Sequence, residues 1–370
     1  MSEYAPRGDL RSSLRAFLTE ASPTAETRRA MESTDGFDRN VWKRLSSDLG
    51  VLGMHVPTRY GGGGRSYRDL LIVFEESGHA LLCSPLLSTV ALAMNTVMAS
   101  GDEQLKSELF PRIASGDTVV TVAYTEDNGR WDDAGVMTTA ARRGDNWFLN
   151  GQKSFVIDGH AADVFIVAAR MGDGISLFEV DGDATGLTRR DLPTMDQTRR
   201  LARIELAGTR ARLVGRKGGG WVALSRGLDL TVIALAAEQV GGTQRCLEMA
   251  VAQAKGRVQF GRAIGGFQAV KHACADMLVA LESARSALAY ASGIASTDSS
   301  AELPLAASLA KASCSDAYLA VAAANVQLQG AKGCTWDHDA HLFLKRAKSS
   351  ELLFGDPMFH RTRLAGHLGL

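Results

Sequence analysis

The sequence predicts an α+β protein in which a helical domain, a strand-rich domain and a second helical domain follow one another. Apolar residues recur with helical spacing up to about residue 117, and short β-branched runs separated by turn residues continue to about 216. Long Ala- and Leu-rich runs then return. Because helical and strand-rich stretches follow one another as separate blocks, the order argues against an alternating doubly wound sheet. It therefore also argues against a Rossmann nucleotide-binding site. We therefore expect domains at 1–117, 118–216 and 217–370.

The N-terminal domain is expected to be α-helical. Its periodic stretches end near glycines, as helices commonly do, and lie at 13–21, 37–50, 66–101 and 103–116. The glycine-rich segment YGGGGRS at 60–66 lacks the Lys and the Ser or Thr of a phosphate-binding P-loop. It is predicted to be a loop between helices.

The middle domain is expected to be a β-barrel or sandwich. Its β-branched runs, bounded by turn residues, lie at 118–126, 135–151, 153–159, 162–170, 175–182 and 199–208. KGGGW at 217–221 marks the next boundary. Beyond it, helices are predicted at 227–258, 267–296 and 303–330, and their length and small residues indicate a four-helix bundle.

Composition narrows the classes of function. The 41 Lys and Arg residues balance 41 Asp and Glu residues without a long run of one sign, so nothing indicates nucleic-acid binding. The polar N-terminus and the lack of an uninterrupted apolar segment of about 20 residues favour a cytosolic protein without a membrane span. Five scattered cysteines without a CxxC pair predict free, mostly buried thiols.

One segment is more specific than propensity can explain. Residues 257–268 read RVQFGRAIGGFQ between two predicted helices. This segment resembles the third domain of the acyl-CoA dehydrogenase family, which carries an Arg, Phe-Gly, Ile and Gln at this spacing. Further resemblances run in order along almost the whole chain, at LGVLGMHVPTRYGGGGRSYRDLLIVFEESG, VAYTEDNGRWD, GQKSFVIDGHAADVFIVAAR and VQLQGAKGCTWDHDAHLFLKRAK.

The resemblance implies an FAD held between the middle and third domains, with its adenine end reaching a neighbouring subunit of a dimer or tetramer. It also implies α,β-dehydrogenation of an acyl-CoA thioester, with an electron-transferring flavoprotein as acceptor. That chemistry needs a carboxylate base in a dry pocket, donors at the thioester oxygen and a fixed flavin.

Several flavin positions of the family are retained. Arg257 would neutralise the diphosphate, Phe260 would pack on the adenosine portion, and Thr125 would face the flavin ring. The remaining retained positions are Gln268, Gln327 and Gly330.

Other flavin positions are changed. Trp131 replaces a hydroxyl residue, Phe155 replaces a Trp, and Ile157 replaces a Thr or Ser, so polar contacts to the ring are depleted. Ala331 replaces the second glycine of the diphosphate segment, where a Cβ would hinder close backbone approach, although the charge of Lys332 could compensate.

The catalytic base is missing from both family positions, which are Phe354 and Thr231 here. Neither side chain can remove a proton from the thioester α-carbon. Glu238, two helical turns beyond Thr231, is a weak candidate. Glu351 and Asp356 flank Phe354 but are more typical of solvent-exposed carboxylates. Asp229 matches a residue that contacts CoA, whereas the family Arg three residues later is a valine.

Two function classes remain open at this point. The chain could be the base-lacking subunit of a mixed oligomer with a related chain, acting on a bulky acyl group such as a steroid side chain. Alternatively, it could be a non-catalytic assembly protein that has lost its flavin. A flavin enzyme of altered reaction is a third option that no residue singles out. His338 and His341 have a spacing compatible with metal ligands, but no further ligand set accompanies them, so no metal is expected.

Overall fold

The chain divides into two compact units that do not follow the sequence in simple blocks. The computed structural model describes residues 7–172, 174–297 and 301–369. Unit 1 takes its residues from 1–28, 67–82 and 232–370, and unit 2 takes its residues from 29–66 and 83–231. Helix α7 (Gly220–Gly256) passes from unit 2 into unit 1 after Thr231.

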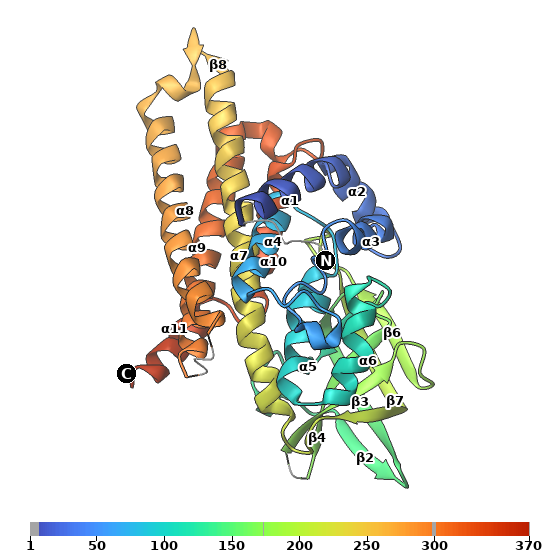
Figure 1. Ribbon diagram of the computed structural model, residues 1–370. Coiled ribbons are helices and arrows are strands. Elements are labelled where there is room, and N and C mark those ends of the chain that lie inside the picture. Colours follow the sequence, from blue (N-terminus) through green and yellow to red (C-terminus); the bar gives the residue numbers. More distant parts are fainter. Residues whose placement is uncertain (1–6, 173, 298–300, 370) are drawn as a thin grey trace. The chain divides into compact units, whose positions relative to one another are not determined.

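Unit 1 is a helical bundle built from both ends of the sequence. Besides the second part of α7, its helices are α1 (Arg7–Ala21), α4 (Tyr67–His79), α8 (Gln268–Ala295), α9 (Leu303–Gln329), α10 (Ala340–Leu352) and α11 (Pro357–His367). Helix α9 packs against α8, α10 and α11, and α8 and α9 run side by side in Figure 1. The predicted C-terminal bundle is confirmed, and α1 and α4 from the N-terminal region join it.

Glycines allow three helices of unit 1 to approach closely. A Cβ on Gly78 of α4 would lie 2.0 Å from the backbone oxygen of Glu238 in α7. A Cβ on Gly241 of α7 would lie 1.8 Å from the backbone oxygen of Glu75, and one on Gly242 would lie 2.4 Å from the Tyr318 ring of α9. The backbones of α4 and α7 therefore pack directly on one another, and Gly242 leaves room for the Tyr318 ring.

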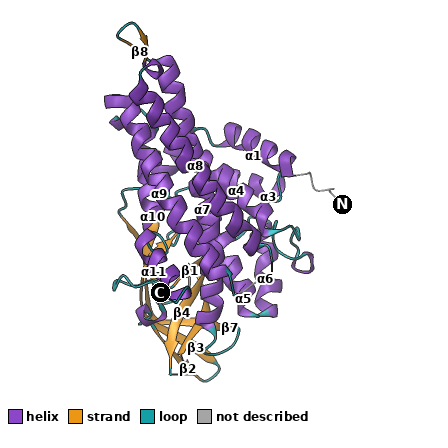
Figure 2. Ribbon diagram, turned by 90° about the vertical axis from the view of Figure 1, so that its left-hand side faces the viewer, coloured by secondary structure: helices purple, strands orange, loops and turns teal. Residues whose placement is uncertain are grey.

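Short elements connect the helices of unit 1. Strands β8 (Val258–Gln259) and β9 (Arg262–Ala263) form a small hairpin after α7, and η4 (Ile264–Gly266) leads from it into α8. Figures 1 and 2 both show this hairpin at the end of α7 and α8. The turn η5 (Gly330–Cys334) follows α9.

Unit 2 contains the strand-rich domain. Its strands, orange in Figure 2, are β1 (Val120–Ala123), β2 (Thr139–Arg143), β3 (Asn146–Ile157), β4 (Val164–Met171), β5 (Gly174–Asp181), β6 (Leu187–Leu192) and β7 (Leu201–Val214). They lie in the order β1-β4-β2-β3-β7-β5, and β6 is added beside β7. Because β5 also pairs with β4, the sheet curves round into a barrel.

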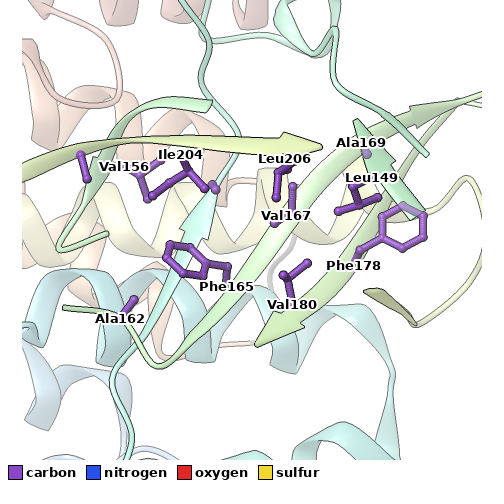
Figure 3. Close-up of a cluster of buried hydrophobic side chains, with 12 residues drawn as sticks. Leu149, Val156, Ala162, Phe165, Val167, Ala169, Phe178, Val180, Ile204 and Leu206 are labelled. Atoms are coloured by element: carbon purple, nitrogen blue, oxygen red, sulfur yellow. The ribbon is translucent and has the colours of Figure 1, made fainter. Parts of the chain in front are cut away.

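The barrel interior is apolar. Phe165, Phe178, Leu149 and Ile204, from four different strands, are fully buried together (Figure 3). The helical segments that accompany the barrel are α3 (Arg39–Ser47), η1 (Thr58–Tyr60), η2 (Leu86–Ala93), α5 (Met94–Ser100), α6 (Glu103–Ala114) and η3 (Asp133–Gly135).

The observed elements differ from the predicted ones at several places. The stretch 66–101 is interrupted after α4 because Leu81 takes a left-handed conformation and Pro85 lacks the amide hydrogen that a helix needs. The predicted strand 135–151 divides into β2 and the first part of β3, and the predicted strand 153–159 continues β3. Helices α2 (Thr24–Glu32), α10 and α11 and strands β6, β8 and β9 were not predicted. The Arg189 side chain of β6 donates to the carbonyl oxygens of His160 and Ala162, which are contacts that a local pattern cannot reveal.

Two sequence-level expectations concern α7 and the cysteines. By length and composition α7 could cross a membrane, but 67% of its apolar window is buried inside the structure, as in the core helix of a bundle. The cysteines are free, as predicted, and Cys83, Cys246 and Cys314 are buried. The segment 60–66 forms a loop after η1, also as predicted.

Candidate active site

In unit 2, the structure brings Thr125 and Phe155 onto neighbouring segments. The Thr125 hydroxyl donates to the carbonyl of Ser154 at 2.5 Å, and the Ser154 amide donates to the carbonyl of Thr125 at 2.9 Å. Phe155 follows at a register shift between β3 and β7, has φ +60°, and is 45% exposed. Because the Thr125 hydroxyl proton is already donated, this group can offer a ligand only its lone pairs.

From outside the barrel, the Asp127 carboxylate binds the segment that contains the register shift at Phe155. Asp127 accepts from the Ser154 hydroxyl at 2.5 Å, from the Gln152 amide at 2.7 Å and from the Arg203 guanidinium at 2.5 Å. The hydrogen bond from Ser154 is the main reason that the pKa of Asp127 lies below its usual range. This bracing holds the backbone that carries Phe155.

The neighbouring residues point inward and form a buried ion pair. The Lys153 ammonium is 0% exposed and lies 2.7 Å from the Glu126 carboxylate. The same carboxylate oxygen accepts from the Thr138 amide and hydroxyl, each at 2.9 Å. Burial alone would raise the pKa of Glu126, but Lys153 and the amides of Thr138 and Met137 lower it below its usual range. The pair joins the segment after β1 to β3 and to the start of β2.

The two remaining flavin positions of unit 2 are apolar. Trp131 packs on Tyr124, with ring centroids 6.3 Å apart. Ile157 is buried, and its carbonyl accepts from the Thr121 hydroxyl at 2.6 Å. Neither side chain supplies the hydroxyl that the family resemblance leads one to expect.

In unit 1, the structure brings Arg257 and Gly330 together. Arg257 follows the end of α7, and its guanidinium donates to the carbonyl of Gln329 at 3.2 Å. Gly330 has φ +69°, and a Cβ there would lie 2.9 Å from the Arg257 guanidinium. Only glycine combines this backbone conformation with room for the arginine. The result is a cation beside bare backbone, which is an arrangement suited to a phosphate group.

Three other predicted flavin residues of unit 1 are exposed. Phe260 lies at the turn of the β8–β9 hairpin with 93% of its surface accessible, φ +50°, and one edge-to-face neighbour, Phe267, at 6.2 Å. Gln268 is the first residue of α8, and Gln327 lies near the end of α9. Apart from this contact, the Phe260 ring packs little within its own chain.

The positions predicted for a base or for CoA binding are buried. In unit 2, Thr231 is 0% exposed and its hydroxyl donates to the carbonyl of Gly227 at 2.6 Å, while Asp229 is 4% exposed. In unit 1, Phe354 is 6% exposed. Neither a threonine whose hydroxyl is hydrogen-bonded within its own helix nor a phenylalanine can accept the α-proton.

The carboxylates that lie close in sequence to the predicted base positions already form ion pairs or cap a helix. Glu238 is buried and pairs with the buried Arg346 of α10 at 2.9 Å. Glu351 pairs with Lys348 at 2.5 Å, and Asp356 caps α11 by accepting from the Phe359 amide at 2.8 Å. A carboxylate held by a buried arginine is a poor proton acceptor, because removing its charge leaves the arginine unpaired.

The His338 and His341 side chains do not converge on a common point. The His338 ring accepts from the Ala340 amide at 3.1 Å, whereas His341 lies against Trp336 with ring centroids 5.3 Å apart. Within the described ranges, no three His, Cys, Asp or Glu residues are grouped as metal ligands would be.

Family models match nearly the whole chain. The acyl-CoA dehydrogenase N-terminal domain matches residues 7–117, the middle domain matches 121–208, and the C-terminal domain matches 218–369. The chain belongs to the acyl-CoA dehydrogenase family. This acyl-CoA dehydrogenase is therefore an oxidoreductase of the class that acts on the CH–CH bond of acyl-CoA thioesters. The resemblance read from 257–268 and the accompanying segments is confirmed.

Individual relatives of this acyl-CoA dehydrogenase are informative. Acyl-CoA dehydrogenase IpdE2 of Mycolicibacterium smegmatis is 34% identical over 96% of both chains. Among solved structures, a variant of the Tcur3481-Tcur3483 steroid ACAD has 28% identity and a TM-score of 0.88 over 98% of this chain and 97% of that one. The ChsE4-ChsE5 complex from Mycobacterium tuberculosis has 26% identity and a TM-score of 0.90 over 100% and 98%.

The acyl-CoA dehydrogenase family depends on FAD, and the two units of this chain fit that cofactor unequally. In unit 1, the cradle of Gly330 and the Arg257 guanidinium suit a diphosphate. In unit 2, the side chains at the positions predicted to contact the flavin ring supply one hydroxyl, and its proton is already donated to the carbonyl of Ser154. Sequence reasoning missed the Asp127 brace and the Glu126–Lys153 pair. The signal that could have found them is the presence of Glu126, Asp127 and Lys153 at the ends of otherwise strand-like segments.

Proposed function

We propose that this chain is the base-lacking subunit of a mixed acyl-CoA dehydrogenase oligomer. A related chain supplies the carboxylate, and this chain contributes Arg257 and Gly330 to an FAD shared across the interface. The single observation that carries the proposal is the loss of the proton acceptor. Both family base positions are buried non-acidic residues, and the weak substitute Glu238 is neutralised by Arg346.

The unequal fit to FAD supports a shared cofactor. FAD, when bound, accepts the hydride that leaves the β-carbon. This chain's own residues would neutralise the diphosphate through Arg257, leave backbone accessible at Gly330, and present Phe260 to the adenosine portion. The positions of unit 2 that are predicted to contact the flavin ring offer few polar groups. The partner chain would therefore contact the ring and remove the α-proton.

The substrate class and the electron acceptor are also part of the proposal. The solved Tcur3481-Tcur3483 protein is described as a steroid ACAD, which supports a bulky acyl-CoA such as a steroid side-chain thioester as substrate for the mixed oligomer. The proposed acceptor of the electrons is an electron-transferring flavoprotein. Both can be assayed once the partner chain is in hand, with a panel of short, long and steroid acyl-CoA thioesters.

The decisive experiment compares the chain purified alone with the chain co-expressed with a related chain that has Glu at either family base position. We expect the mixed oligomer to retain flavin and oxidise acyl-CoA, and the isolated chain to show at least 100-fold lower turnover, which is the order expected for losing a general base. Arg257→Ala should lower the flavin content of the mixed oligomer. Lys255→Ala, two residues earlier in sequence, should leave the flavin content unchanged.

Two outcomes would contradict the proposal. Full turnover by the isolated chain that is lost in Glu238→Gln would make Glu238 the base. Absence of flavin at the shared site, with Arg257→Ala indistinguishable from the unmodified chain, would instead favour a flavin-free assembly protein, which Trp131 and Ile157 support.

A further inference from the structure

The connection between α1 and α2 borders a pocket that lies entirely within unit 1. Its volume is about 290 Å³, close to the smallest ligand sites of proteins, which have volumes of about 300–1,000 Å³. The side chains that line it come from α1, the start of α2, the end of α4, α7 and α10. We call it the α1–α2 pocket, and its polar lining includes Arg15, Ser22, Thr24, Glu76 and Arg245. It shares no residue with the cradle of Arg257 and Gly330.

Arg245 of α7 brings a positive charge to this pocket. It forms only a loose ion pair with Glu248, at 3.8 Å, which is too long for a hydrogen bond. Glu248 instead accepts from the ring of His79 and from the amide of Gln244, each at 2.8 Å. In the part of the chain that the structure describes, the Arg245 guanidinium donates to no other group. Its N–H groups therefore remain available for a ligand.

Arg15 of α1 brings a second guanidinium, which shares its charge with Glu76. Its Nε and Nη2 atoms donate to the Glu76 carboxylate at 2.7 and 3.0 Å. The same buried carboxylate accepts from Arg11 at 2.5 Å. Two arginines thus neutralise Glu76, the only carboxylate among the described residues of the lining, while Nη1 of Arg15 keeps its donors. The lining therefore does not repel an anion.

Ser22, between α1 and α2, offers a buried hydroxyl to the pocket. Ser22 is 7% exposed, and its hydroxyl forms no hydrogen bond within the described ranges. Its oxygen is not fully enclosed by protein, so the small accessible part of Ser22 includes the hydroxyl and reaches the pocket. A buried polar group without a protein partner is costly unless water or a ligand binds it. The hydroxyl therefore points to an occupant of the pocket.

The first turn of α2 adds a further donor. The carbonyl of Pro23 accepts from the amides of Glu26 and Thr27 at 2.8 and 3.1 Å. The amide of Thr24 has no acceptor among the residues that the structure describes, and both Pro23 and Thr24 line the pocket. The partial positive charge at the start of a helix favours a negatively charged ligand.

We propose that the α1–α2 pocket binds a phosphate group. Its donors come from three directions, namely Arg15 with Ser22, the first turn of α2, and Arg245. A phosphate group is a tetrahedral anion with three or four acceptor oxygens, so it can accept from all of them, whereas one guanidinium already satisfies a planar carboxylate. The rest of the wall includes the apolar side chains of Leu18 and Phe343, which would suit the organic part of a small phosphate monoester. The proposal needs neither flavin nor a partner chain and does not rest on the proposed function.

The test is isothermal titration calorimetry of the full-length, flavin-free chain at neutral pH and low ionic strength. Inorganic phosphate and glycerol 3-phosphate are the two probes, titrated separately. We expect saturable binding of at least one probe. Arg245→Met should weaken that binding about tenfold or more, and Ser22→Ala about threefold, because each removes a donor. Arg361→Met removes an arginine of α11 that pairs with Asp316, and should leave the affinity unchanged.

Arg257→Ala separates this pocket from the cradle of Arg257 and Gly330, which also suits a phosphate group. We therefore expect the binding, and its loss in Arg245→Met, to persist in the Arg257→Ala background. Tighter binding of glycerol 3-phosphate would identify a monoester as the ligand class, and tighter binding of inorganic phosphate would identify the free ion. Absence of saturable binding of both probes would overturn the proposal. An affinity that is unchanged in Arg245→Met or in Ser22→Ala, or binding that disappears in Arg257→Ala, would overturn it as well.

Discussion

At the scale of single residues, the site depends on charged side chains that the fold has buried. Lys153 is completely enclosed, although lysine is among the residues least often found inside proteins. It is tolerated because Glu126 lies 2.7 Å away and is itself held by Thr138. Such a pair contributes little net stability, but removing one member leaves the other charge buried and unpaired.

We therefore expect Lys153→Met to lower the free energy of unfolding by about 3–5 kcal/mol, as measured by urea denaturation. Arg142→Met removes an exposed strand cation that pairs with Asp145, and should change stability by less than about 0.5 kcal/mol. The double variant Lys153→Met with Glu126→Gln should recover part of the loss. Equal stability of Lys153→Met and the wild-type chain would contradict this account of the pair.

At the scale of elements, glycines set the distance between helices of unit 1. Helices usually pack 8–10 Å apart through side chains, but at Gly78 and Gly241 the backbones of α4 and α7 are in contact. Glu238 lies at this crossing and reaches Arg346 of α10. The crossing therefore determines where the only substitute base candidate of α7 is held.

Gly78→Ala should destabilise the chain by about 3 kcal/mol, because its Cβ would overlap the backbone oxygen of Glu238 and neither backbone can move freely. Gly256→Ala is the matched control, since a Cβ at this last residue of α7 meets nothing within 4 Å. That substitution should be neutral or stabilising by up to about 1 kcal/mol. Thermal and urea unfolding of both variants measure the difference, and similar effects would show that the crossing does not constrain the helices.

At the scale of the whole molecule, Phe260 is expected to act only in the proposed assembly. Phe260 is 93% exposed, has a positive φ and contacts one other ring, that of Phe267, so the isolated chain gains little stability from it. The same hairpin follows Arg257, whose guanidinium lies against Gly330. Both features agree with a cofactor shared between chains.

Phe260→Ser should leave the thermal midpoint of the isolated chain within about 2 °C of the wild-type value, because surface substitutions usually change stability by less than about 0.5 kcal/mol. In the mixed oligomer the same change should lower flavin content or weaken assembly, as measured by absorbance and by size-exclusion chromatography with light scattering. Met137→Ser, at another exposed apolar residue, is the control. A large fall in the midpoint of the isolated Phe260→Ser chain would mean that the ring packs within its own chain.

Much of the architecture could be predicted because local patterns of apolar and β-branched residues specify it. The β-branched runs of 162–170 and 175–182 specify β4 and β5, and the long periodic runs specify α8 and α9. Strand β6 escaped prediction because LTRRDL is polar, and it is held in place by β7 and by Arg189. The interruption after α4 depends on one left-handed residue, Leu81, whose conformation no propensity indicates.

The sequence by itself determined the family and the order of helical and strand-rich segments, and it predicted non-acidic residues at the two family base positions, because residue identity and spacing are properties of the chain alone. The tertiary structure decided which charges are paired. Glu238 is one carboxylate among many in the sequence but an ion-pair partner of Arg346, 108 residues away, in the folded chain. Burial and long-range contacts set the charge of a side chain, and both arise only when distant segments pack together.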